Sequence, residues 1–104
     1  MFNFLKSLIS NTPTVDLAAI IARKPFLVDV RKPEEFSSGH PKGAVNIPLD
    51  EIATNIEKFK TKKEIVVFCR SGNRSNQAKN ILQSHGIANV IDAQTWKNVA
   101  QYTG

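Results

Sequence analysis

The most informative stretch of the chain is Ile65–Ser75, which reads IVVFCRSGNRS. Its first part, Ile65–Phe68, is apolar and rich in β-branched residues, which is typical of a buried strand. A helix is expected from Ser75, and Gly86 is a natural stop for it. A buried strand that leads through a short polar loop into a helix is the unit of an α/β fold. In such folds ligands bind at the carboxyl ends of the strands, where this loop would lie.

Three further apolar runs are predicted to be short strands: Phe26–Val30, Val45–Ile47 and Val90–Ile91. Helical segments are expected between and after them: beyond an N-cap at Thr14, from Glu34 to Ser38, over Ile52 to Phe59, and around Trp96. Strands that alternate with helices predict a mainly parallel sheet covered on both faces, so the fold class is α/β.

Length and composition fit one small globular domain, since the chain has 104 residues of which 41% are hydrophobic. No apolar run reaches the roughly eighteen residues of a membrane span, so we expect no membrane contact. The segment Met1–Ile9 is apolar but short, and we expect residues 1–12 to form an N-terminal extension or helix that packs on the domain. We expect a cytoplasmic protein, and the sequence leaves its oligomeric state open.

The formal net charge of +5 raises the possibility of a nucleic-acid partner. The basic residues are scattered, however, and only Lys58–Lys63 is dense. No aromatic residues interleave with the charges as a base-stacking surface requires. We therefore expect no nucleic-acid partner, and the charge fits an attraction for small anions equally well.

Cys69 is the only cysteine, and it stands between the predicted strand and the helix N-terminus. Backbone N–H groups of a loop in this position can converge into an anion-binding nest, and the helix dipole adds to their effect. These groups, with the nearby arginines, would lower the thiol pKa and make Cys69 a nucleophile near neutral pH. We predict Cys69 as the catalytic residue and the six residues after it as substrate-binding: Arg70, Ser71, Gly72, Asn73, Arg74 and Ser75.

Three segments in order resemble the rhodanese family of single-domain sulfurtransferases. They are LVDVRKPEEF at 27–36, GHPKGAVNIP at 39–48 and CRSGNRS at 69–75. The resemblance covers most of the chain. It implies that residues 1–104 form one rhodanese-like three-layer domain with a mainly parallel five-stranded sheet.

The resemblance also implies a reaction. Cys69 would attack the outer sulfur of thiosulfate or a similar small anionic donor, sulfite would leave, and a persulfide would form. A low-molecular-weight thiol, a protein thiol or cyanide would then remove the sulfur. This is double displacement through a covalent intermediate, and it implies no metal and no organic cofactor.

Several neighbouring residues have structural interpretations. Asp29 and Arg31 flank one strand residue and share a face, so we expect a brace in which Arg31 binds a carboxylate or loop carbonyls. We expect His40 to order its loop, His85 to lie at the surface and Trp96 to pack at the core or its rim.

The chain departs from the family at one place. Gln94-Thr95 stands where rhodanese-like domains usually carry a Gly-Gly pair after the last strand. We expect this segment to border the mouth of the active site and to affect substrate preference.

Other functions remain open for the loop at 69–75. Phosphatases and arsenate reductases that use cysteine place an arginine six positions after it, whereas Arg74 lies five positions after Cys69. The smaller loop favours sulfur over phosphorus. A sulfur carrier or a regulatory binding module of the same family is the alternative outside small-molecule catalysis.

Overall fold

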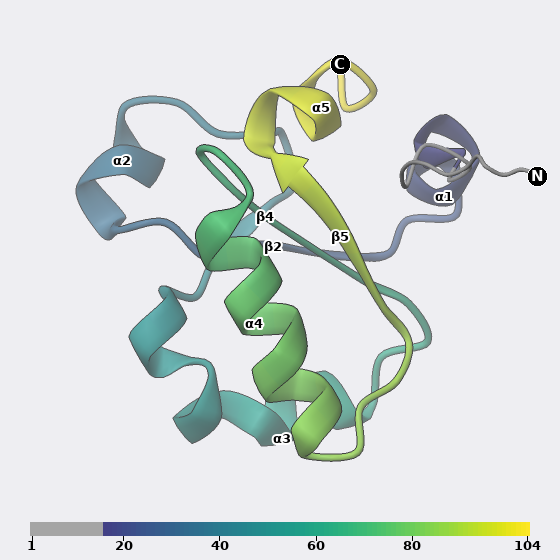
Figure 1. The fold of residues 1–104 in the computed structure, drawn as a ribbon. Coiled ribbons are helices and arrows are strands. Elements are labelled where there is room, and N and C mark those ends of the chain that lie inside the picture. Colours follow the sequence, from purple (N-terminus) through teal and green to yellow (C-terminus); the bar gives the residue numbers. More distant parts are fainter. Residues whose placement is uncertain (1–15) are drawn as a thin grey trace, which may run out of the picture.

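The computed structural model of the chain describes residues 16–104, shown in Figure 1. The expectations for residues 1–12 and for a cap at Thr14 fall outside these residues. The described elements, in chain order, are α1 (Leu17–Ala22), β2 (Phe26–Asp29), α2 (Pro33–Ser37), β3 (Val45–Asn46), the 3-10 turns η1 (Leu49–Glu51) and η2 (Ala53–Asn55), α3 (Ile56–Lys60), β4 (Ile65–Cys69), α4 (Asn73–Ser84), β5 (Val90–Thr95) and α5 (Trp96–Ala100).

The sheet is parallel throughout and has the strand order β3-β2-β4-β5. This confirms the α/β class. The expectation of five strands is wrong for residues 16–104, which form four. Each of the four apolar runs in the sequence became one strand, whereas the fifth strand rested on the family resemblance alone. β2 and β4 are the two central strands, and Asp29 and Cys69 are their last residues.

The core has two parts, one on each face of the sheet. β4 is buried along its whole length, so its side chains alternate between two packed faces. Ile65, Val67 and Cys69 join the cluster that includes Phe59 of α3 and Leu82 of α4. Val66 and Phe68 face the second cluster, which residues of α1 and α5 cover: Leu17, Ile20, Ile21, Trp96 and Val99. The expected helices on both faces are therefore confirmed.

Helix boundaries differ from expectation in three places. α1 begins after Asp16, whose Oδ1 accepts a hydrogen bond from the N–H of Ala19 at 3.1 Å. The expected single helix over 52–59 is two 3-10 turns and one short helix. There Asn55 and Thr54 donate to the carbonyl of Glu51 and compete with regular helical bonding. The third difference is that α4 starts at Asn73, ahead of Ser75.

The longest helix in residues 16–104 is α4, with 12 residues. No helix in this part of the chain is both long and apolar enough to span a membrane.

Candidate functional site

The sulfur of Cys69 lies inside a ring of hydrogen-bond donors. Cys69 is the last residue of β4, and three loop residues separate it from α4. Its Sγ accepts the backbone N–H of Gly72 at 3.0 Å and that of Ser75 at 3.4 Å. The Ser75 hydroxyl lies 3.6 Å from the sulfur. The sulfur therefore takes the place of the capping oxygen that a side chain at the start of a helix normally supplies.

Opposing effects act on the pKa of the Cys69 thiol. Burial is the largest single cause and raises the pKa, because a thiolate loses its hydration. The backbone N–H of Ser75, the Ser75 hydroxyl and the N–H groups of Gly72 and Ser71 each lower it. The hydrogen bonds together outweigh burial, so the pKa lies below its ordinary value of 9.0. A larger fraction of Cys69 is therefore present as the nucleophilic thiolate near neutral pH.

Gly72 gives the loop its shape. Its φ of +101° lies in the left-handed region, which side chains disfavour. A Cβ at this position would lie 3.4 Å from the Cβ of Gln94. Gln94 itself has a φ of +70° and sits next to an irregularity in the pairing of β4 with β5. Gln94 therefore lies against the loop that follows Cys69.

The six predicted substrate-binding residues do not all point at the sulfur. Gly72 and Ser75 do, through the contacts given above. Asn73 is the first residue of α4 and turns away, since its Oδ1 accepts from Gln77 at 3.2 Å. Arg70 and Ser71 are exposed at the loop surface, and of Ser71 only the backbone N–H acts on the sulfur. Asn73 is helical, so Gly72 is the loop residue that adopts the left-handed conformation.

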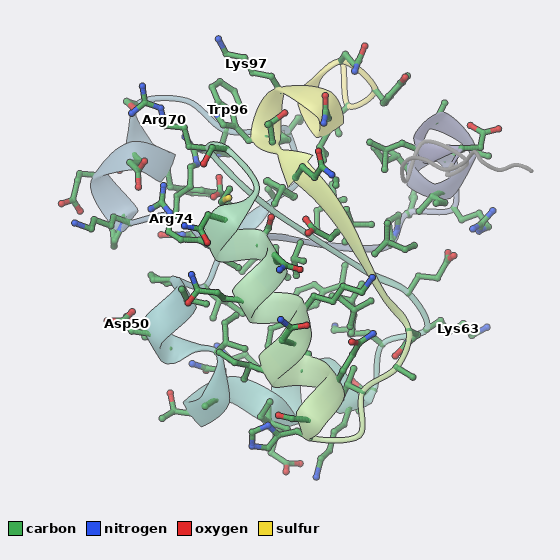
Figure 2. The ribbon with its side chains drawn as sticks, in the orientation of Figure 1. Asp50, Lys63, Arg70, Arg74, Trp96 and Lys97 are labelled. Carbon is green, nitrogen blue, oxygen red and sulfur yellow. The ribbon has the colours of Figure 1, made fainter. Side chains whose placement is uncertain are left out.

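Arg74 is tied to a partner that the sequence did not suggest. Its guanidinium donates to both carboxylate oxygens of Glu35, at 2.6 and 3.1 Å. Glu35 also accepts the N–H of Lys32 at the start of α2. The bond from Arg74 is the first cause, and the Lys32 N–H the second, that lowers the pKa of Glu35 to about 2. Figure 2 shows Arg74 extending from the start of α4 toward α2.

A buried ion pair braces the strand beside the loop. Arg31 donates to both carboxylate oxygens of Asp29, the shortest bond being 2.7 Å. Its Nη2, which makes the shortest of these bonds, also donates to the carbonyl of Gly39 at 2.6 Å. The guanidinium carbon lies 4.8 Å from the centre of the Trp96 ring. The expected structural brace is confirmed, and Trp96 packs at the rim of the core.

The two histidines make local contacts only. The His40 ring stacks on Phe36, with Nδ1 2.7 Å from the Phe36 carbonyl oxygen, which orders the loop as expected. His85 is exposed, and its Nδ1 lies 3.0 Å from the carbonyl oxygen of Ile81. Across residues 16–104 no three His, Cys, Asp or Glu side chains gather as a metal site would require.

A cavity of about 480 Å³ opens over the carboxyl ends of the strands. Arg31 follows β2, Arg70 follows β4 and is the neighbour of Cys69, and Thr95 and Trp96 lie at the junction of β5 and α5. The complete lining is Arg31, Glu35, Ser38, Arg70, Thr95, Trp96 and Lys97. Figure 2 shows Arg70, Trp96 and Lys97 at this end of the molecule.

Known proteins resemble this chain over most of its length. A family model described as "Rhodanese-like domain" matches residues 13–95. Thiosulfate sulfurtransferase PspE of Escherichia coli (strain K12) is 39% identical over 75 residues, which are 70% of this chain and 72% of that protein. The uncharacterized protein YqhL of Bacillus subtilis (strain 168) is 37% identical over 70 residues, which are 67% of this chain but only 56% of that protein.

Two further relatives show how widely the domain is shared. The putative sulfur carrier protein YrkF of Bacillus subtilis (strain 168) is 35% identical over 66 residues, which are 64% of this chain and 36% of that protein. A solved structure of a rhodanese with anions from E. coli matches with a TM-score of 0.65 and 38% identity. The match covers 72% of this chain and 91% of that one.

Proposed function

This chain belongs to the rhodanese-like domain family, and on that premise we propose that it is a sulfurtransferase that carries sulfur on Cys69. The donor is thiosulfate or a similar small anion, and the acceptor is a thiol or cyanide. The observation that supports the proposal most directly is the set of N–H groups around the Cys69 sulfur, which lowers the pKa of the thiol.

The first half of the reaction loads the enzyme. The Cys69 thiolate attacks the outer sulfur of thiosulfate and forms a sulfur–sulfur bond. The bond between that outer sulfur and the sulfonate sulfur breaks, and its electron pair leaves with sulfite. The product is a Cys69 persulfide, whose negative charge lies on the terminal sulfur. The N–H groups that stabilise the thiolate are the groups available to this anion.

The second half of the reaction discharges the persulfide. Cyanide or a thiolate attacks the terminal sulfur, and the sulfur–sulfur bond of the persulfide breaks. The electron pair returns to the Cys69 sulfur as thiolate, so the free enzyme is restored. Thiocyanate forms from cyanide, and a new persulfide forms from a thiol. No external oxidant or reductant is needed in either half.

Cys69 is 0% exposed in the resting structure, so the donor reaches it only after side chains at the mouth move. Arg70 is exposed, follows Cys69 directly and lines the cavity over the strand ends. We infer that the donor enters from this cavity, where Arg70 is the cation nearest to Cys69 in the chain.

The site suits sulfur transfer better than phosphoryl transfer. A phosphoryl group on Cys69 would need N–H groups and an arginine around its equatorial oxygens. Here the N–H groups of Gly72 and Ser75 are directed at the sulfur itself, and both carboxylate oxygens of Glu35 hold Arg74. We therefore expect negligible hydrolysis of aryl phosphates.

The test is steady-state sulfur transfer from thiosulfate to cyanide by wild type and Cys69→Ser, with an aryl phosphate assayed in parallel. We expect turnover by wild type and none by Cys69→Ser, with unchanged circular dichroism. Near wild-type turnover by a folded Cys69→Ser protein would overturn the assignment, as would efficient phosphate hydrolysis by wild type.

A sulfur carrier is the second candidate, because one relative bears the name of a putative sulfur carrier protein. A carrier would form the same Cys69 persulfide but discharge it slowly to small acceptors. Fast loading by thiosulfate together with very slow discharge to cyanide and to small thiols would favour the carrier over the enzyme.

A further inference from the structure

A strained backbone position lies beside the reacting cysteine. Gln94 has a φ of +70°, a conformation that residues with side chains rarely adopt. The next residue, Thr95, is the one that pairs with Cys69 in the sheet. Strain of this kind persists only where the surrounding structure holds it, and it is frequent at functional sites. The conformation of Gln94 therefore points to a role at the neighbouring cysteine.

Side chains from β5 and α5 hold the backbone at Gln94. The Gln94 N–H donates to Oδ1 of Asp92 at 2.8 Å. The pairing of β5 with β4 skips Ala93, so this residue forms a β-bulge. The Ala93 carbonyl accepts the side-chain amide of Asn98 at 2.9 Å. Both polar groups of the peptide bond between Ala93 and Gln94 are thus held by side chains.

The stem of the Gln94 side chain packs against Gly72. A Cβ added to Gly72 would lie 3.4 Å from Cβ and 3.6 Å from Cγ of Gln94, so even a methyl group would be in contact. Gly72 donates its N–H to the Cys69 sulfur at 3.0 Å. Gln94 therefore limits movement of Gly72 toward β5, and with it movement of this N–H away from the sulfur.

The carbonyl of Gln94 faces the second group that contacts the sulfur. The Ser75 hydroxyl oxygen lies 3.6 Å from the Cys69 sulfur. It lies 3.1 Å from the Gly72 carbonyl oxygen and 3.5 Å from that of Gln94. When Cys69 is a thiol, its S–H can donate to the hydroxyl, which in turn donates to a carbonyl. When Cys69 is a thiolate, the hydroxyl proton turns to the sulfur. The two carbonyls keep the hydroxyl in place for both arrangements.

We propose that Gln94 is a positioning residue for sulfur transfer, which holds the Gly72 N–H and the Ser75 hydroxyl at the sulfur of Cys69. The inference rests on the proposed function, because it concerns the same reacting sulfur. Gln94 acts through the loop between β4 and α4, and it supports this loop from the adjacent strand β5. Asp92 has an indirect part, since its carboxylate holds the Gln94 backbone.

The test is the pH profile of Cys69 alkylation by iodoacetamide in wild type, Gln94→Gly and Gln94→Ala. Glycine removes both stem atoms and adopts the positive φ without strain, so Gln94→Gly should fold with about wild-type stability. Its midpoint should rise by about half a unit, because hydrogen bonds to the sulfur are loosened but not removed. Gln94→Ala keeps the Cβ, the stem atom nearest Gly72, and should show a smaller rise. Asn76→Ala is the matched control, since Asn76 is exposed on α4 beside the same loop, and its midpoint should equal that of wild type.

The direction of the shift separates positioning from simpler effects. If Gln94 only shielded the sulfur from water, its removal would ease burial and lower the pKa of Cys69. Asp92→Ala is the second variant. Loss of its negative charge alone would lower the midpoint, whereas release of the Gln94 backbone should raise it. An unchanged or lowered midpoint in either Gln94→Gly or Asp92→Ala would overturn the inference.

Loading by thiosulfate measures the consequence for the reaction. At a pH below both midpoints, half a unit corresponds to about threefold less thiolate, so Gln94→Gly should load about threefold more slowly than wild type. The difference should disappear above both midpoints. A deficit that persists there would mean that Gln94 acts on the donor directly, which would also overturn the inference. If the midpoints shift as expected but wild type never gains sulfur, the proposed function fails and the effect of Gln94 on Cys69 stands.

Discussion

The pKa of the Cys69 thiol depends on single hydrogen bonds, whose effect a pH profile can measure. Alkylation by iodoacetamide requires the thiolate, so its rate rises with pH through the pKa of the thiol. Because the pKa of Cys69 is lowered, the midpoint should lie below 9.0. In Ser75→Ala the midpoint should move to higher pH by about one unit, the lower end of the range for a hydrogen bond to a charged group.

Ser71→Ala is the control for this profile. Ser71 lies in the same loop and is exposed, and the substitution keeps the backbone N–H that faces the sulfur. Its midpoint should match wild type. The same midpoint in Ser75→Ala as in wild type would mean that the hydroxyl contributes nothing to the thiolate.

The ion pair of Glu35 with Arg74 should make folding depend on acid. The pKa of Glu35 is lowered to about 2 from 4.5, chiefly by the bond from Arg74. A lowered pKa means that the pair stabilises the fold fully above about pH 4.5 and loses this contribution as pH falls toward 2. Glu35→Gln should therefore lower the free energy of unfolding at neutral pH by about 1 kcal/mol, since the pair is partly exposed.

This difference should vanish near pH 2, as measured by urea unfolding at several pH values. Glu34→Gln is the control, because Glu34 is exposed in the same turn of α2 and forms no ion pair within the described part of the chain. A Glu35→Gln deficit that stays constant down to pH 2 would show that lost packing, not charge, causes it.

At the level of residues, the sequence predicted the N–H groups around the Cys69 sulfur better than the partners of the nearby charged side chains. Cys69, Gly72 and Ser75 could be predicted because they are adjacent in the chain and the loop geometry follows from a strand meeting a helix. The partner of Arg74 could not, since Glu35 is 39 residues away and only the packing of α2 beside α4 brings them together. The sequence held one indication of this contact. The segment that contains Glu35 follows the strand β2, which lies beside β4, so both segments begin at the same end of the sheet.

The conformation of the loop between β4 and α4 depends on Gly72, the loop residue with a left-handed backbone. Gly72→Ala should lower the free energy of unfolding by about 1–2 kcal/mol, because alanine disfavours the left-handed conformation. The variant should also raise the midpoint of Cys69 alkylation, since relaxation of Gly72 withdraws its N–H from the sulfur. Urea unfolding and the alkylation profile together measure both effects.

Gly43→Ala is the control that separates the effect of backbone strain on stability from the effect of the loop on the Cys69 pKa. Gly43 has a φ of +86° and no atom within 4 Å of its added Cβ, so it carries the same kind of backbone strain outside the loop. It should lose similar stability while the alkylation midpoint stays at the wild-type value. Equal midpoints in both variants would contradict the role given to Gly72.

At the level of elements, patterns of apolar residues predicted the strands well and the helix boundaries less well. Each apolar run became a strand because four parallel strands bury both faces of the sheet. The amphipathic spacing over 52–59 predicted the buried side chains Ile52 and Phe59 correctly. It could not show that side-chain bonds to the Glu51 carbonyl would divide the helix.

The whole molecule brings together groups that lie far apart in sequence. β2, β4 and β5 run parallel, so Arg31, Cys69 and Thr95 reach the same edge of the sheet. The sequence predicted this edge as the site, because ligands bind there in parallel sheets. The cavity could not be predicted, since its lining combines α2, the loop after β4 and α5. The number of strands could not be predicted either, because a family resemblance does not determine which segments of this chain pair as strands.

Intact mass after incubation with thiosulfate tests the central claim that Cys69 carries the transferred sulfur. Wild type should gain the mass of one sulfur atom, and cyanide or a reducing thiol should remove it. Cys69→Ser should gain nothing under the same conditions, and Lys63→Gln should behave as wild type. An unchanged wild-type mass while sulfite accumulates, or the same gain in Cys69→Ser, would contradict the claim that sulfur passes through a Cys69 persulfide.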